Sequence, residues 1–156
     1  MGETIRILLA DDHPLIRAGL RTTLEVEDDI VVAGEASDGD EAQRQCAVLH
    51  PDVLVLDLNM PGSTAVETLA SVHASCPRTR VLMLTAYDDD AYVRGLVQAG
   101  AMGYVLKDEA PEALVQAVRS VAQGGTWFSQ QVVARLVLPT SPDPRDHANL
   151  TQRELQ

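Results

Sequence analysis

The stretch Val53-Leu54-Val55-Leu56-Asp57-Leu58-Asn59-Met60-Pro61-Gly62 decides the fold of this chain. Its first four residues are apolar without interruption, which predicts a strand buried on both faces, as in a parallel sheet. Pro61-Gly62 indicates a turn shortly after the strand. Asp57 therefore ends a buried strand at the rim of a sheet, where a carboxylate is held rigidly, and it is the first candidate for a functional residue.

Outward from this stretch, short apolar runs alternate with longer segments of helical periodicity. This alternation is typical of an α/β protein with a parallel sheet covered by helices on both faces. Helices are expected after each strand, with Gly100 ending the fourth and Pro111 beginning the fifth. The five expected strands are Ile5–Ala10, Ile30–Ala36, Val53–Leu56, Val81–Leu84 and Gly103–Leu106, and the second and third helices are expected over Asp40–Leu49 and Ala65–Ser75.

The last thirty residues differ in character from the rest. Ser129–Leu138 is predicted to form an additional amphipathic helix, and the proline-rich stretch Pro139–Pro144 is predicted to form a semi-rigid linker. Thr151 and Glu154 then have the spacing of a capping box at the start of a helix. The expected organisation is a main domain over 1–124, an extra helix and linker over 125–149, and the start of a further domain over 150–156.

The charge balance excludes one class of function for these residues. Twelve basic against 23 acidic residues give a net charge of -11, so the chain should repel the phosphates of DNA.

No apolar run approaches the ~20 residues that span a bilayer, and the N-terminus lacks the regions of a signal peptide. Cys46 and Cys76 have no metal-ligand spacing and are interpreted as reduced, structural cysteines. We expect a cytoplasmic protein without a membrane partner.

Polar residues occur at four of the five predicted strand ends. Asp11 and Asp12 follow the first strand, Asp57 the third and Lys107 the fifth, while Thr85 ends the fourth. The carboxyl ends of parallel strands share one edge of the sheet, so these groups should converge. Two unit charges at 4 Å repel by about 4 kcal/mol near a protein surface, and Mg²⁺ relieves such repulsion with oxygen ligands and substrate phosphates. The pattern predicts a site that receives a phosphoryl group on Asp57.

The roles within this predicted site follow from residue chemistry. Asp11 and Asp12 are the candidate Mg²⁺ ligands, Lys107 is the candidate cation for a phosphoryl oxygen, and the Thr85 hydroxyl can donate a hydrogen bond. Each residue alone has a commoner role, as a turn former, a solvated lysine or a strand-ending hydroxyl. His13 is interpreted as a polar residue at the start of the first helix in preference to a ligand or an acid/base.

Four motifs of the chain resemble the successive motifs of response-regulator receivers, and most of all those of the NarL/FixJ (LuxR-type) subfamily. The motifs are Asp11-Asp12-His13-Pro14, Asp57-Leu58-Asn59-Met60-Pro61-Gly62, Leu84-Thr85-Ala86 and Leu106-Lys107-Asp108. The resemblance covers roughly Ile5 to Gln123. Leu150–Leu155 resembles the first residues of that subfamily's helix-turn-helix effector, so the chain is interpreted as a transcription factor truncated at the start of its effector.

The resemblance implies a doubly wound, flavodoxin-like sheet with strand order 2-1-3-4-5. It implies a signalling switch in which a sensor histidine kinase phosphorylates Asp57 with Mg²⁺, the domain itself promoting phosphotransfer and dephosphorylation without being an enzyme. It further implies that Asn59 offers its backbone carbonyl to the metal, along with the carboxylate of Asp57, and that Thr85 and Tyr104 reorient together. Activation would favour a homodimer, and DNA would be bound only through the effector. Many receivers place a proline where this chain has Asp108, so a cis bond is not assumed there.

Three other classes of function are weighed against this switch. A phosphatase of the haloacid-dehalogenase type also uses an aspartate after an apolar strand, but it requires a second acidic residue where this chain has Asn59. A nucleotide-binding flavodoxin-like protein would need a glycine-rich loop after the first strand, and none is present. An interaction module that no longer accepts phosphate is the remaining alternative, although all the expected pocket residues are present.

Overall fold

A parallel sheet of six strands organises residues 4–85, 90–109 and 111–129, the part of the chain that this computed structural model describes. The strands are β1 (Ile5–Ala10), β2 (Ile30–Ala36), β3 (Val53–Asp57), β4 (Arg80–Thr85), β5 (Gly103–Leu106) and β6 (Trp127–Phe128). Their order is β2-β1-β3-β4-β5-β6, and each neighbouring pair is parallel. The predicted α/β class and the order 2-1-3-4-5 of the first five strands are confirmed.

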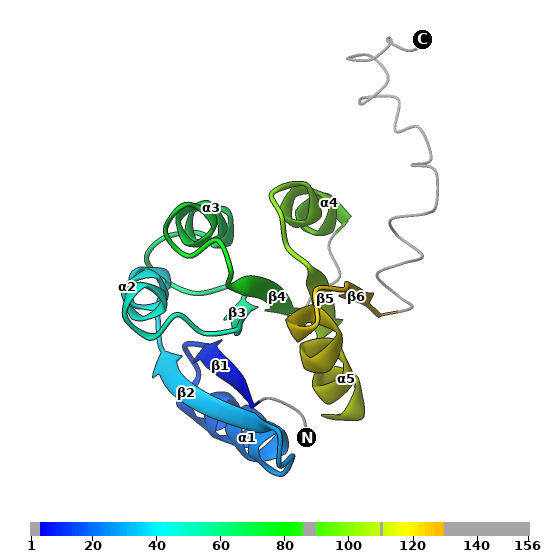
Figure 1. The fold of residues 1–156 in the computed structure, drawn as a ribbon. Coiled ribbons are helices and arrows are strands. Elements are labelled where there is room, and N and C mark those ends of the chain that lie inside the picture. Colours follow the sequence, from blue (N-terminus) through cyan, green and yellow to red (C-terminus); the bar gives the residue numbers. More distant parts are fainter. Residues whose placement is uncertain (1–3, 86–89, 110, 130–156) are drawn as a thin grey trace, which may run out of the picture.

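Helices cover both faces of the sheet (Figure 1). They are α1 (Pro14–Glu25), α2 (Gly39–Leu49), α3 (Ala65–Ser75), α4 (Asp90–Gln98) and α5 (Pro111–Ala122). Val53 and Val55 of β3 are buried with side chains of α1 and α5, whereas Leu54 and Leu56 are buried with side chains of α2, α3 and α4. Successive side chains of a strand point to opposite faces of the sheet, and here helices cover both faces. Every residue of the run is therefore buried, which explains why the run contains no polar residue.

The loop after β3 is fixed at both of its ends. Its turn contains Gly62 at a φ of +83°, which favours glycine, and a Cβ there would lie 2.8 Å from a carboxylate oxygen of Asp40. At the other end a capping box starts α3: Glu67 N donates to Thr64 Oγ1 at 3.1 Å, and Thr64 N donates to Glu67 Oε1 at 2.9 Å. An N-cap of this kind contributes about 1 kcal/mol. The short connection between Asp57 and α3 is thereby held in one shape.

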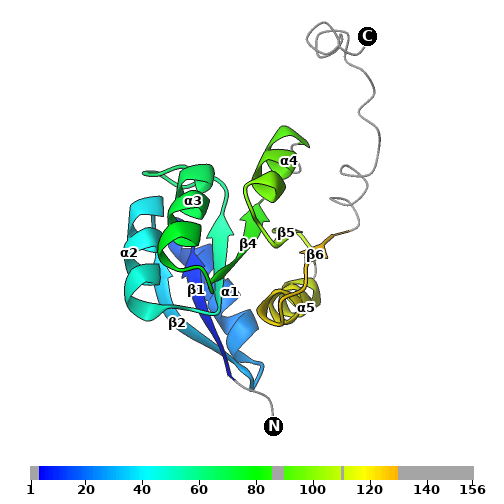
Figure 2. The same cartoon turned by 45° about the horizontal axis from the view of Figure 1, so that its top comes forward.

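The sixth strand was not predicted, and the expectation of five strands is corrected here. Trp127 pairs with Gly103 and Phe128 with Tyr104 along β5, so β6 forms the edge of the sheet beyond β5 (Figure 2). A run of two residues is too short for a periodic pattern to reveal. The sheet therefore includes residues beyond 124, while the boundaries of the domains stay a prediction. Except for Ser129 itself, the predicted helix over Ser129–Leu138 and everything after it lie outside the described residues.

Cys46 and Cys76 are free and buried in the same core, and burial raises the pKa of the Cys46 thiol to about 12, in keeping with a structural role. None of the helices in the described part of the chain combines the length and the apolar character that crossing a bilayer requires.

Candidate functional site

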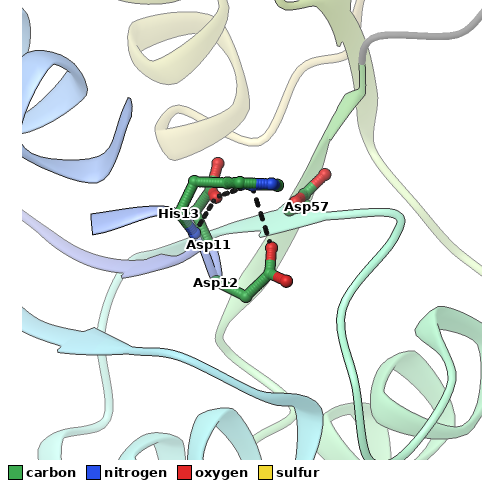
Figure 3. Close-up of side chains that lie close together, drawn as sticks. All are labelled: Asp11, Asp12, His13 and Asp57. Atoms are coloured by element: carbon green, nitrogen blue, oxygen red, sulfur yellow. Dashed lines mark hydrogen bonds and ion pairs between the residues drawn. The ribbon is translucent and has the colours of Figure 1, made fainter. Parts of the chain in front are cut away.

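Three carboxylates meet at the carboxyl ends of β1 and β3, which are paired neighbours in the sheet. Asp11 and Asp57 are almost fully buried, with 0% and 3% of their surface exposed, and Asp12 beside them is partly exposed. Together with His13, each offers one ligand atom within 4.8 Å of the others (Figure 3). The predicted convergence of these aspartates, although Asp57 lies 45 and 46 positions from Asp12 and Asp11 in the sequence, is observed.

Lys107 reaches the same carboxylates from the end of β5. Its Nζ lies 3.0 Å from Asp11 Oδ2 and 3.2 Å from Asp57 Oδ2. Its backbone N donates to the carbonyl of Thr85 at 2.7 Å, which ties the residue after β5 to the end of β4. A single ammonium group therefore bridges the two buried carboxylates.

The charges of the site do not balance in the described structure. Burial raises the pKa of Asp57 and the charge of Asp11 adds to this effect, while Lys107 opposes it. Burial lowers the pKa of Lys107, but its contact with Asp11 and the charge of Asp57 outweigh burial, so the net direction is upward. Lys107 therefore stays charged at neutral pH. Lys107 is thus one permanent cation facing three carboxylates. The two buried carboxylates, Asp11 and Asp57, carry more negative charge than Lys107 neutralises.

This donor set fits a hard divalent cation. Carboxylate oxygens are the ligands that Mg²⁺ prefers, and it uses few of them because waters and phosphate oxygens complete its octahedron. Buried carboxylates with excess negative charge are stabilised by such an ion. The acidic cluster of Asp11, Asp12 and Asp57 is thus compatible with a metal site.

Arg17 holds the backbone of Asp11 in place, and the sequence analysis did not identify this residue. Its Nη1 donates to the backbone carbonyl of Asp11 at 2.6 Å, and its Nε donates to Glu35 Oε1 at 2.6 Å. The backbone N of Asp11 donates to the Ala36 carbonyl at 3.0 Å. The end of β1 is therefore linked to both α1 and β2. An arginine on the first helix carries no sequence signal that distinguishes it from a solvated one.

The remaining predicted residues lie as follows. Asp57 is in register with Leu84, so Thr85 lies one position beyond it on the neighbouring strand, and Thr85 is buried. Tyr104 is fully buried in the core shared with α3 and α4, opposite Met83 in the register of β4. Asn59 is exposed, with its backbone N 3.5 Å from Asp57 Oδ1. The described peptide bonds include no cis bond, so the bond before Asp108 is trans.

His13 belongs to the site more closely than the sequence analysis expected. It stands at the N-cap of α1, where its side chain makes no cap hydrogen bond. Its Nδ1 instead lies 3.0 Å from Asp12 Oδ1 and 3.2 Å from Asp11 Oδ1, as the dashed lines in Figure 3 show. The only sequence signal for this position was its adjacency to the two aspartates.

A parallel α/β domain with a buried acidic cluster and a lysine at the strand ends defines a class of signalling domain, and comparison with known proteins gives the family. The response regulator receiver domain matches residues 7–119. The chain therefore belongs to the response regulator receiver family.

Curated relatives and solved structures agree with this assignment. The chain is 35% identical over 160 residues to the uncharacterized transcriptional regulatory protein YxjL of Bacillus subtilis, with 99% of this chain and 73% of that protein covered. It is 38% identical to the oxygen regulatory protein NreC of Staphylococcus epidermidis, with 85% of this chain and 62% of that protein covered. A LuxR-family two-component response regulator from Aurantimonas sp. superposes with a TM-score of 0.82 at 34% identity, covering 86% of this chain and 96% of that one. The chain is a receiver domain homologous to two-component regulators of transcription.

Proposed function

We propose that this domain is a phosphorylation-dependent switch in which Asp57 accepts a phosphoryl group from a sensor histidine kinase. The observation that carries the proposal is the pairing of one partly buried lysine, Lys107, with two buried carboxylates, Asp11 and Asp57, at the carboxyl edge of the sheet. In the proposed step a carboxylate oxygen of Asp57 attacks the phosphorus of a phosphohistidine. A P–O bond forms as the P–N bond breaks, giving an acyl phosphate and a free histidine.

Each neighbour of Asp57 has a defined task in this step. Asp11, Asp12 and Asp57, with the backbone carbonyl of Asn59, would hold Mg²⁺, which supplies positive charge to the phosphoryl oxygens when bound. Lys107 already lies 3.2 Å from Asp57 and is placed to pair with a phosphoryl oxygen once the acyl phosphate forms. The same residues would promote autodephosphorylation.

The output would start from Thr85 and Tyr104. A phosphoryl group adds about -1.5 to -2 charges and three acceptor oxygens, and the hydroxyl of Thr85 would move toward it, giving the ring of Tyr104 room to turn. Tyr104 of β5 pairs with Phe128 of β6, and the carbonyl of Tyr104 accepts a hydrogen bond from Ser129 N at 3.4 Å. A shift at Tyr104 would therefore reach the segment that leaves the domain.

Downstream of this switch, activation would favour a homodimer in the cytoplasm. DNA would be contacted through a helix-turn-helix effector that begins at 150–156, after an extra helix and linker over 125–149. The names of the relatives, which include a transcriptional regulatory protein and a LuxR-family response regulator, support this assignment. The net charge of -11 argues that the receiver itself is not the DNA-binding part.

The acceptor is tested by incubating the chain with acetyl phosphate, with Mg²⁺ or with a chelator, and weighing it intact. The wild type is expected to gain one phosphoryl group only with Mg²⁺, and Asp57→Asn none. Asp108→Asn is the matched control, because this carboxylate is exposed and follows Lys107 directly; it should be labelled like the wild type. An adduct that persists in Asp57→Asn, or no adduct on folded wild type with Mg²⁺, would overturn the proposal.

The switch is tested separately with Thr85→Ala. Loss of the hydroxyl should leave phosphorylation of Asp57 measurable while weakening the phosphorylation-dependent change in association state, followed by light scattering. An unchanged response in a variant that is phosphorylated to the same extent would remove Thr85 from the switch and leave the acceptor role of Asp57 intact.

A further inference from the structure

We propose that His13 adds a nitrogen ligand to the acidic site, so that the site binds a first-row transition-metal ion such as Co²⁺ more tightly than an oxygen-only site would. The inference adds a ligand to the metal site of the proposed function, and it rests on that function's proposal that a metal ion binds there. It starts from the ring of His13, which turns toward Asp11 and Asp12 and leaves the backbone of α1 without a side-chain cap.

The distances between the side-chain ligand atoms of His13, Asp11, Asp12 and Asp57 suit the binding of one ion by all four. Ligand atoms at about 2.1 Å from an octahedral ion lie about 3.0 Å apart when adjacent and about 4.2 Å apart when opposite. The Nδ1 of His13 lies 3.0 Å from Asp12 Oδ1 and 3.2 Å from Asp11 Oδ1, close to the separation of adjacent ligands. With Asp57 included, all four ligand atoms lie within 4.8 Å of one another. A small inward movement of Asp57 or the imidazole would complete a four-ligand set.

His13 is anchored where its ring can make this adjustment. Its backbone N donates to Asp11 Oδ1 at 2.8 Å, which keeps the residue beside the buried carboxylate. Its side chain is 57% exposed, so the ring has room to turn and an arriving ion can reach it. In Figure 3 the ring of His13 lies over Asp11 and Asp12, with Asp57 beside them. The imidazole is thus the solvent-facing member of a set whose other end is buried.

The chemistry of this set differs from that of a pure carboxylate site. Mg²⁺ favours oxygen ligands, whereas an imidazole nitrogen suits ions such as Co²⁺, Ni²⁺ and Zn²⁺. Affinities for a given site with nitrogen and oxygen donors rise from Mn²⁺ through Co²⁺ and Ni²⁺ to Cu²⁺ and fall again at Zn²⁺. Asp11 and Asp57 are two buried carboxylates that share the single ammonium group of Lys107, and this arrangement attracts either kind of ion. The imidazole therefore changes which ion the site prefers, and low concentrations of Co²⁺ should displace Mg²⁺.

The test compares His13→Gln with His50→Asn by calorimetric titration of Co²⁺ and Mg²⁺. His50 lies at the end of α2 with a φ of +46°, a conformation that asparagine tolerates, so its replacement removes one imidazole without disturbing the site. His13→Gln should lower Co²⁺ affinity by about tenfold or more while changing Mg²⁺ affinity by no more than about twofold. His50→Asn should match the wild type for both ions.

A second readout identifies the ligand directly. In the Co²⁺-loaded protein, proton NMR should show strongly shifted imidazole ring signals that persist in His50→Asn and disappear in His13→Gln. Absence of such signals from the wild type, or equal Co²⁺ affinity in wild type and His13→Gln, would overturn the inference. Phosphorylation of Asp57 with Mg²⁺ is measured on the same samples. Normal phosphorylation with unchanged Co²⁺ binding refutes only the role of His13, whereas absence of phosphorylation in the wild type refutes the proposed function.

Discussion

Replacement of Asp57 by asparagine should stabilise the metal-free protein, even though it removes the proposed phosphoacceptor. The side chain of Asp57 is buried beside Asp11 and Asp12, and among the residues that the structure describes Lys107 is the only permanent cation in contact with it. Asparagine keeps the shape of the side chain and removes its charge. Lys107 retains an ion pair with Asp11 at 3.0 Å, so the substitution does not strand the ammonium group.

The magnitude follows from competing interactions. With ligand atoms of the three carboxylates within 4.8 Å of one another, each neighbour repels Asp57 by about 3.5 kcal/mol at an effective dielectric of about 20. Lys107 at 3.2 Å attracts it by about 5 kcal/mol on the same scale, and burial of the charge adds a further cost. The raised pKa of Asp57 shows that the unfavourable effects prevail. We expect Asp57→Asn to raise the free energy of unfolding by about 1–2 kcal/mol, or about 3–6 °C in Tm.

The gain should depend on pH and on Mg²⁺ in defined directions. Because the pKa of Asp57 is higher in the folded state than in the unfolded state, its ionisation costs stability as pH rises through the folded-state pKa. Below the unfolded pKa, about 3.9, Asp57 is protonated in both states and the difference from asparagine should vanish. Saturating Mg²⁺ should stabilise the wild type more than the variant, because binding to the folded state adds stability.

Urea unfolding of both proteins, with and without Mg²⁺, measures the effect, and Asp108→Asn is the control for losing an exposed carboxylate nearby. Asp108→Asn should leave the unfolding free energy within about 0.5 kcal/mol of the wild type. The electrostatic reasoning fails if Asp57→Asn is destabilised at neutral pH without metal, or if its gain persists unchanged at saturating Mg²⁺.

Three further predictions test other parts of the structure. Arg17→Ala should lower stability by about 1–3 kcal/mol and weaken Mg²⁺ binding, because the carbonyl of Asp11 loses a charged donor at 2.6 Å; unaltered urea unfolding and calorimetric titration would contradict this. Gly100→Ala should destabilise by about 1–3 kcal/mol, since its Cβ would clash with the His73 ring and its backbone has a φ of +113°. Adding His73→Ala should restore only part of the melting temperature, and full recovery would show that φ carries no strain. The Cys46 thiol, whose pKa burial raises to about 12, should react with a thiol reagent only as the protein unfolds, and prompt labelling of the native state would refute its inertness.

Local sequence determined the fold because its evidence lies within short windows. The run Val53–Leu56 needed no distant partner to be recognised as a buried strand, and its end at Asp57 gave the position of the candidate acceptor. Pro111 and Ala65–Ser75 fixed helix bounds in the same way, and the structure has both as expected. The strand ends then placed Lys107 beside Asp57, since parallel strands share one carboxyl edge.

Only the tertiary structure decided the features that depend on distant partners. The two residues of β6 are a strand because β5 offers them a free edge, and no two-residue pattern contains that information. Arg17 acts at the site because α1 packs its guanidinium between Asp11 and β2. The ring of His13 faces the carboxylates because the chain turns into α1 there. Periodicity determines which segments are buried, whereas side-chain contacts arise from the packing of segments that are far apart in the sequence.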